Sequence, residues 1–317
     1  MGKRLAVLGV GAVGRAVLEL AESHGHEVVA AADSRSAIID ADGIDPAAVL
    51  VRKDGDEPIG TADPESVVQA DYDVLVEATP TTLGDAQPGF NHVRAALETD
   101  RHVVLANKGP IAERYAEVRE LERSSAGAVR FEATVGGAIP ILQVIHDYGP
   151  QHVTAARGVL NGTANFILTR MADEGLGFEH VLAEAQDLGV AEADPTFDVD
   201  GTDAALKCVI LANVLTDGDP AFSLADAAVE GIEHVPPSAL ELATEDGRAV
   251  RLIGEATREA VSVAPRLVPV NDALAVSGTQ NIVQVTTRDA GLLNLSGRGA
   301  GGPETATAVL ADVNRLP

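Results

Sequence analysis

The sequence predicts an α/β protein with a doubly wound parallel sheet, followed by a second α+β domain. Short apolar runs alternate with stretches of helical spacing in the first part of the chain, as in sheets whose strands are joined by helices. A GxGxxG turn directly follows the first apolar run. From Phe131 the composition becomes rich in glycine and apolar residues, as expected where a chain passes between domains.

The first domain is expected to span residues 1–131. Its short apolar runs have the length and composition of strands buried on both faces. We expect strands at 5–10, 27–32, 74–77 and 102–106. The intervening segments have apolar residues at helical spacing, which predicts helices at 15–23, 64–69, 90–99 and 111–124.

The second domain is expected to span residues 132–297, with a second sheet. Strands are predicted at 153–160 and 280–287, and helices at 165–174, 178–188, 202–215 and 238–245. The last glycine-rich turn, which includes Gly301, leads into a helix that reaches Val313. We expect residues 298–317 to return to the first domain and complete it.

The first glycine-rich turn predicts binding of a dinucleotide. Gly9, Gly11 and Gly14 lie between a strand and a helix, with Ala12 and Val13 inside the turn. Glycines allow the backbone to approach a pyrophosphate at the start of the helix. Asp33 follows about 20 residues later, where such folds place the acid that contacts a ribose. The sequence therefore predicts NAD or NADP as the cofactor.

The residues after the second strand leave the choice of cofactor open. Asp33 favours NAD, because a carboxylate accepts hydrogen bonds from the ribose hydroxyls. Arg35 lies beside Ser34 and favours NADP, because it offers a cation to the additional phosphate. The Ser-Arg-Ser run inclines the prediction towards NADP.

Two further segments follow predicted strands of the same sheet. Ala78 and Thr79 come after the third strand, and Asn107 and Lys108 after the fourth. Ligands bind beyond the carboxyl ends of parallel strands, so these residues are candidates for the site. The alternative is that Lys108 is an ordinary solvated loop lysine.

One helix combines an apolar surface with a single lysine. Between Ala204 and Ala212 the only charged residue is Lys207, and Asp203 lies one helical turn earlier. A helix without a polar face is normally buried, and a buried lysine beside a carboxylate can exchange a proton. The alternative is a structural ion pair. An acidic block precedes this helix, with Glu184, Asp187, Glu192, Asp194, Asp198 and Asp200.

The overall composition limits the class of partner. The formal net charge is -25, from 48 acidic and 23 basic residues, of which four are lysines. Such an excess resembles that of halophilic proteins and argues against binding to nucleic acid or an anionic membrane. The single cysteine, Cys208, excludes an internal disulfide and indicates a reducing compartment, so we expect a cytoplasmic protein. The sequence shows neither a signal peptide nor an apolar run of membrane-spanning length.

Several segments together resemble homoserine dehydrogenase, over nearly the whole chain. They read GVGAVG at 9–14, ANKGP at 106–110, EATVGGAIPI at 132–141, GVLNGTANFIL at 158–168, the acidic block through Lys207, and GRGAGGPETATAVLAD at 297–312. The resemblance implies NAD(P)-dependent interconversion of L-homoserine and L-aspartate 4-semialdehyde, in threonine and methionine biosynthesis.

The resemblance also implies roles for individual residues. Lys207 would be the acid/base, Asp203 its partner and Lys108 a second lysine of the site. Residues implied to contact the substrate are Glu192, Asp198, Gly162 and Thr163. Gly301 would contact the cofactor. Glu132, with the carbonyl groups of Val135, Gly137 and Ile139, resembles a site for a monovalent cation, Na or K.

Other properties of the family are expected as well. The resemblance implies a homodimer or a dimer of dimers, formed through the sheet of the second domain. Many members carry a C-terminal regulatory domain, and the sequence printed here stops at Pro317, so we expect no threonine inhibition through such a domain. Phe166 and Val190 stand where many members have tyrosine, so hydroxyl contacts at those positions are not expected.

Three alternatives remain open from the sequence. An aldehyde dehydrogenase that acts through a thiol would need Cys208, whose apolar helix argues against a nucleophile. Another two-domain amino-acid or sugar dehydrogenase would share the Asn-Lys-Gly turn. A sensor that binds NAD(P) without turnover would leave the acidic block before Lys207 unexplained.

Overall fold

The computed structural model describes residues 2–317, which form two compact units. The first contains the chain up to Ala138 together with residues 300–317, and the second runs from Ile139 to Gly299. The predicted boundaries at 131 and 297 lie a few residues before these divisions. The last segment of the chain thus belongs to the first unit.

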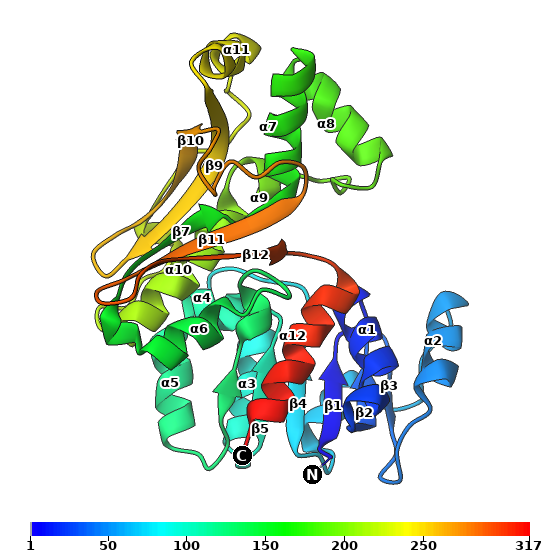
Figure 1. The fold of residues 1–317 in the computed structure, drawn as a ribbon. Helices are drawn as coiled ribbons and strands as arrows, with labels where there is room; N and C mark the ends of the chain where they lie inside the picture. The colour runs from blue at the N-terminus through cyan, green and yellow to red at the C-terminus, as the bar shows by residue number, and fades with distance from the viewer. Residues whose placement is uncertain (1) are drawn as a thin grey trace. The chain divides into compact units, whose positions relative to one another are not determined.

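The first unit is built on a six-stranded sheet in the order β3-β2-β1-β4-β5-β6 (Figure 1). All neighbouring pairs are parallel except β2 with β3. This strand order is that of dinucleotide-binding folds, with the order reversing between β1 and β4. The predicted fold class is confirmed. The strands are β1 (Arg4–Leu8), β2 (Glu27–Ala32), β3 (Ala37–Ile39), β4 (Val74–Glu77), β5 (His102–Leu105) and β6 (Val129–Arg130).

Helices join these strands, and the last helix of the chain packs against the first. Apolar side chains of α1, α12, β1 and β4 form one core cluster, which includes Val17, Val309 and Leu310. The helices are α1 (Ala12–Leu20), α2 (Pro46–Asp54), α3 (Gly89–Leu97), α4 (Gly109–Glu113), α5 (Tyr115–Arg123) and α12 (Gly302–Arg315), with 3₁₀ turns η1 (Glu22–His24), η2 (Pro64–Gln69) and η3 (Glu132–Thr134).

The prediction of one helix over 111–124 is wrong, because Arg114 interrupts it. Arg114 has φ -131° and separates α4 from α5. Its guanidinium lies 4.1 Å from the centre of the Phe90 ring and also donates to the carbonyl oxygen of Asp85. These contacts accompany the break, and helical spacing in the sequence did not reveal them.

The second unit contains a mostly antiparallel sheet in the order β12-β11-β7-β9-β10-β8, in which only β10 and β8 pair in parallel. Its strands are β7 (Val153–Val159), β8 (Ala227–Val229), β9 (Arg248–Thr257), β10 (Val261–Pro269), β11 (Gln280–Thr287) and β12 (Gly291–Arg298). Its helices are α6 (Ile141–Tyr148), α7 (Gly162–Glu174), α8 (Phe178–Asp187), α9 (Thr196–Val199), α10 (Thr202–Thr216) and α11 (Pro237–Glu245), with 3₁₀ turns η4 (Pro150–His152) and η5 (Leu224–Asp226).

Helix α10 is the central helix of this unit. It packs against β7, β9 and β10, and every residue from Ala204 to Asn213 is buried. Strand β9 approaches it so closely that a Cβ added to Gly254 would lie 2.5 Å from the sulfur of Cys208. The absence of a polar face in the sequence therefore predicted the burial of α10 correctly.

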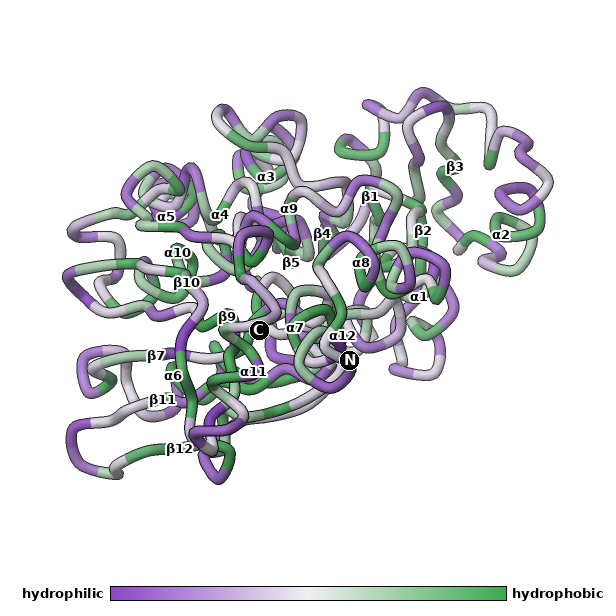
Figure 2. Tube along the Cα trace, turned by 90° about the horizontal axis from the view of Figure 1, so that it is seen from above, coloured by the Kyte–Doolittle hydropathy of each residue, from purple (hydrophilic) through white to green (hydrophobic). Residues whose placement is uncertain are grey.

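Hydrophilic and hydrophobic stretches alternate along the chain. In Figure 2, many of the purple, hydrophilic stretches lie in the turns that join helices and strands. Among residues 2–317, no helix is long and apolar enough to cross a membrane.

Candidate active site

Lys207 lies on the buried helix α10 and is 6% exposed. Its ammonium nitrogen Nζ is 2.6 Å from Oδ2 of Asp203 and 2.7 Å from the backbone oxygen of Leu160. A lysine four residues after an aspartate lies on the same face of a helix, so α10 itself brings the two side chains together. The ion pair predicted from the sequence is present in the structure.

Asn161 connects this ion pair to a second carboxylate. Its Nδ2 donates to Oδ1 of Asp198 at 2.6 Å and to Oδ2 of Asp203 at 2.9 Å. Its Oδ1 accepts from the backbone N–H of Ala164 at 2.8 Å, as the N-cap of α7. The cap fixes the amide, so both carboxylates lie at defined positions beside Lys207.

The electrostatics of Asp198 differ from those of a surface carboxylate. Burial raises the pKa of Asp198 above its ordinary value, and the negative charge of Asp203 adds to the rise. Hydrogen bonds from Asn161 and Thr163 and the charge of Lys207 oppose it without cancelling it. The cluster thus combines one lysine with two carboxylates, and Asp198 holds its proton more tightly than a surface aspartate does.

The other residues predicted to contact a substrate lie at different positions. Thr163 is in the first turn of α7 beside Asp198, and its hydroxyl also donates to the backbone oxygen of Val190. Gly162 begins α7, where a Cβ would lie 2.8 Å from the backbone oxygen of Thr279. Glu192 is exposed, and its backbone oxygen accepts from the Gln186 side chain. No hydrogen bond within the described chain joins the Glu192 carboxylate to the Lys207 cluster.

Sequence reasoning did not identify Asn161 as a site residue. The prediction started the helix at Asn165, whereas α7 begins at Gly162 and Asn161 is its N-cap. Asparagine followed by glycine and threonine after an apolar strand is a recognisable helix start. That signal was present in the sequence and would have placed Asn161 at the end of β7.

Cys208 follows Lys207 on α10 but points into the core. It is fully buried, and burial raises the pKa of its thiol far above the ordinary value. A thiolate is therefore disfavoured at this position.

The first unit carries a glycine turn with the geometry expected for a pyrophosphate. Gly9 has φ +95°, and a Cβ there would lie 2.4 Å from the backbone oxygen of Ala78, so only glycine fits. Gly11 is the N-cap of α1, whose first residue is Ala12, and no side chain caps this helix. A Cβ on Gly11 would meet no atom within 4 Å. The start of α1 thus combines open space with helix N–H groups, which fits a dinucleotide pyrophosphate.

The end of β2 presents Asp33 already paired with a lysine. One carboxylate oxygen accepts from the backbone N–H groups of Arg35 and Ser36, at 2.8 and 2.9 Å, and the other is 2.6 Å from Nζ of Lys53. Burial alone would raise the pKa of Asp33, but the lysine and the two N–H groups outweigh burial and hold it below its ordinary value.

Arg35 lies beside this group and has an exposed partner. Its guanidinium is 2.9 Å from Oδ1 of Asp56, in a pair that is largely open to solvent. Ser34, next to it, is exposed. Lys53 was not predicted as a site residue, because helix α2 was itself missed. It brings a second cation to the position where the ribose of a dinucleotide lies in this fold.

The returning helix contributes Gly301 to the same unit. Gly301 precedes α12, and a Cβ on the next residue, Gly302, would lie 2.6 Å from the backbone oxygen of Ala12. The glycine-rich start of α12 is therefore beside the first turn of α1.

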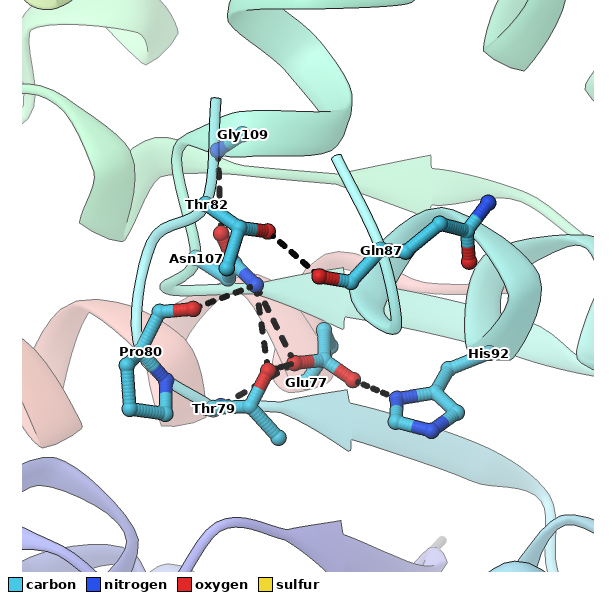
Figure 3. Close-up of polar contacts among 8 residues, drawn as sticks. All are labelled: Glu77, Thr79, Pro80, Thr82, Gln87, His92, Asn107 and Gly109. Carbon is cyan, nitrogen blue, oxygen red and sulfur yellow. Dashed lines mark hydrogen bonds and ion pairs between the residues drawn. The ribbon is translucent and has the colours of Figure 1, made fainter. Parts of the chain in front are cut away.

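The loops after β4 and β5 form one polar network, which is drawn in Figure 3. Asn107 Nδ2 donates to the hydroxyl of Thr79 at 3.1 Å and to the carboxylate of Glu77 at 3.4 Å. The backbone N–H of Lys108 donates to the hydroxyl of Thr81 at 3.3 Å. The structure thus joins the predicted residues Thr79, Asn107 and Lys108, beside Ala78, at the carboxyl edge of the sheet.

The residues resembling a cation site surround a tight turn. Glu132 and Val135 are buried, and Gly136 and Gly137 have positive φ of 77° and 56°. The backbone oxygen of Ile139 accepts from the N–H of Ile141. Residues 2–317 contain no group of three or more His, Cys, Asp or Glu arranged to hold a metal, so a cation here would depend on carbonyl oxygens.

Comparison with known sequences gives a specific relationship. The sequence profile of the homoserine dehydrogenase family matches residues 140–313, and that of the glutamate/leucine/phenylalanine/valine dehydrogenases matches residues 1–82. The NAD(+)-dependent homoserine dehydrogenase of Pseudomonas canavaninivorans is 37% identical over 337 residues, which cover 98% of this chain and 95% of that protein.

Comparison with solved structures agrees. A protein of Archaeoglobus fulgidus, named after the same family, is 38% identical with a TM-score of 0.91, and the match covers 99% of both chains. A hyperthermophilic archaeal homoserine dehydrogenase in complex with NADPH is 28% identical with a TM-score of 0.85, over 99% of this chain and 97% of that one.

Proposed function

The chain belongs to the homoserine dehydrogenase family, and from this we propose that Lys207 is the acid/base in its NAD(P)-dependent interconversion of L-homoserine and L-aspartate 4-semialdehyde. The observation that carries the proposal is the buried pair of Lys207 with Asp203, joined to Asp198 through Asn161. An ion pair that served only the fold would not need a second, half-buried carboxylate beside it.

The geometry of Lys207 suits transfer of one proton. A neutral amine has two N–H bonds and one lone pair, arranged tetrahedrally. Asp203 and the Leu160 carbonyl lie where they accept the two N–H bonds. The lone pair then occupies the remaining direction, where it can take the hydroxyl proton of the alcohol. In the reverse reaction the ammonium returns this proton to the carbonyl oxygen, which contributes about 10²–10⁴-fold to the rate.

The remaining acids give the site its preference for an amino acid. We propose that Asp198 pairs with the substrate ammonium, supported by its position beside Asn161 and Thr163. Gly162 is proposed to let the substrate approach the start of α7. Glu192 is proposed as a second, more exposed acid near the substrate, on the resemblance alone.

Residues of the first unit are proposed to hold the cofactor. Gly9, Gly11, Ala12, Val13, Gly14 and Gly301 would surround the pyrophosphate, Asp33, Ser34 and Arg35 the adenosine ribose, and Ala78, Thr79, Asn107 and Lys108 the remaining part. The bound nicotinamide would accept the hydride from the alcohol carbon or return it to the aldehyde. Both NAD and NADP fit, since Asp33 and the cations Arg35 and Lys53 lie together.

Several finer properties are proposed on the same family basis. We propose a homodimer or dimer of dimers formed through the second unit, a place in threonine and methionine biosynthesis, and a monovalent cation near Glu132, Val135, Gly137 and Ile139. The buried acid and the two consecutive positive-φ glycines support the cation. A cytoplasmic location and adaptation to high salt are supported by the single cysteine and the net charge of -25.

Initial-rate oxidation of L-homoserine tests the reaction. The assay follows nicotinamide absorbance at molar KCl, with NAD and NADP in parallel. We expect turnover with at least one of them. A folded protein that binds cofactor but is inactive with both would point to another amino or hydroxy acid.

A further inference from the structure

The proposed reaction leaves one buried carboxylate without a role. Glu77 is the last residue of β4, and its side chain is 0% exposed. Burying a carboxylate is costly unless it is paired and hydrogen-bonded. Glu77 lies directly before Ala78 and Thr79, at the edge of the sheet where the cofactor residues are proposed to lie.

Both carboxylate oxygens of Glu77 make polar contacts (Figure 3). Its Oε1 accepts from the backbone N–H of Thr79 at 3.0 Å, from the Thr79 hydroxyl, and from Asn107 Nδ2 at 3.4 Å. Its Oε2 lies 2.6 Å from Nδ1 of His92. Both carboxylate oxygens are therefore held by neighbouring polar groups.

These contacts determine the orientation of the Asn107 amide. Its Nδ2 faces Glu77, Thr79 and the carbonyl of Pro80, and its Oδ1 therefore accepts from the backbone N–H of Gly109 at 2.9 Å. The surroundings leave little free volume, because a Cβ on Gly89 would lie 2.6 Å from Nδ2. Both residues that flank Lys108 are thus held through one amide.

We propose that Glu77 is a positioning residue for the two loops that carry Thr79 and Lys108. Its Oε1 acts as the acceptor that holds the Asn107 amide, and His92 holds the carboxylate from the other side. The inference deepens the proposed function, and it rests on the assignment of Thr79, Asn107 and Lys108 to the cofactor and substrate site. Glu77 itself touches neither ligand in this account.

Two substitutions of Glu77 separate the effect of its hydrogen-bond acceptors from the effect of its side-chain size. Glu77→Met keeps a side chain of similar length but removes both acceptors, so Asn107 and Thr79 lose their partner. Glu77→Gln keeps one acceptor oxygen for Asn107 and Thr79, and its N–H can donate to Nδ1 of His92 when the proton of that ring lies on Nε2. The proposal therefore predicts a defect in the Met variant and its rescue in the Gln variant.

The measured quantities are the Kd for NADPH, from nicotinamide fluorescence, and the KM and kcat for L-homoserine. We expect Glu77→Met to lower kcat/KM by roughly 10²-fold, the effect of a displaced site loop, and to raise the Kd for NADPH. Glu77→Gln should stay close to the unmodified protein. A loss of folded protein alone would lower kcat but leave Kd and KM unchanged, which distinguishes positioning from stability.

Controls keep the test decisive. Glu98→Gln removes an exposed carboxylate at the end of α3 and should change neither constant. If Glu77→Met does not fold, the variant His92→Leu is used in its place. It removes the polar partner of Glu77 Oε2, and the His92 side chain is 20% exposed, so its replacement disturbs the core less. Unchanged Kd and KM in a folded Glu77→Met or His92→Leu protein would overturn the proposal. If the unmodified protein does not oxidise homoserine, the proposed function fails, and the Kd for NADPH still decides this inference.

Discussion

The ammonium of Lys207 lies 2.6 Å from the carboxylate of Asp203, one turn earlier on the buried helix α10. The side chains are only 8% and 15% exposed, so solvent screens the pair weakly. Because the Leu160 carbonyl accepts a second N–H, the direction left to a substrate oxygen is restricted. This restricted direction is what the proposed proton transfer requires.

Removal of one partner should destabilise the fold more than removal of both. Asp203→Ala leaves a buried, uncompensated ammonium and should lower the free energy of unfolding by about 3–5 kcal/mol. The double variant Asp203→Ala, Lys207→Met removes both charges, and we expect it to recover much of that loss. Urea unfolding followed by circular dichroism measures the difference. Equal stabilities of the single and double variants would argue against a coupled buried pair.

Binding of the substrate should weaken in acid through Asp198. Burial raises the pKa of Asp198, so its carboxylate takes up a proton at a higher pH than a surface aspartate does. Protonation removes the charge that pairs with the substrate ammonium, and KM for L-homoserine should rise as the pH falls through that pKa. The raised pKa also means that Asp198 favours the fold at low pH and that this contribution is lost as the pH rises through the folded-state pKa.

The variant Asp198→Asn tests this assignment. It should have a high KM for homoserine that no longer depends on pH in the acid range, while the Kd for NADPH stays unchanged. An acid limb that persists unaltered in the variant would assign the pH dependence to another group.

Cys208 should be dispensable for turnover. Its thiol is fully buried, and burial raises its pKa, so a nucleophilic thiolate is disfavoured. We expect Cys208→Ala to keep most of the activity, with a modest loss of stability from the small cavity. Loss of turnover in a folded, cofactor-binding variant would revive the thiol-dependent aldehyde dehydrogenase as an alternative.

Arg35 should contribute to NADP binding but not to NAD binding. Its guanidinium pairs with the exposed Asp56 at 2.9 Å and is free to exchange this partner for the additional phosphate. Arg35→Ala should weaken NADPH binding about two- to fivefold, the effect of one solvent-exposed ion pair, and leave NADH binding unchanged. Arg52→Ala, an exposed arginine on α2, is the matched control. Equal effects on the binding of both cofactors would show that Arg35 does not bind the additional phosphate of NADP.

Much of the first unit was predictable because its signals are local. The strands Glu27–Ala32 and Val74–Glu77 are short runs that are apolar apart from one terminal glutamate each, and they were predicted with their observed bounds. Strands β9 and β10 were missed, although they are the longest in the second sheet. In β9, consecutive residues up to Gly254 are buried, so the strand lacks the alternation of buried and exposed residues expected of an antiparallel strand. Gly254, a residue that is uncommon in strands, lies where β9 contacts Cys208. That close approach is a tertiary contact, which no local pattern records.

The same contrast holds within the candidate site. Lys207 and Asp203 were found from the sequence because helix geometry alone brings them together. Asn161 and Asp198 meet across 37 positions of sequence, and Glu77 meets Asn107 across 30, so their pairing depends on the packing of separate elements. Lys53 reaches Asp33 from helix α2, whose existence the sequence did not reveal.

The most direct test of the account is the initial rate of L-homoserine oxidation by Lys207→Ala, beside the Kd for NADPH of the same protein. The account predicts a fall in kcat of about 10²–10⁴-fold with an unchanged Kd, because Lys207 moves the proton and belongs to the unit that does not carry the glycine turn. Full turnover in the folded variant would contradict the role of Lys207 and make Lys108 the better candidate for the acid/base.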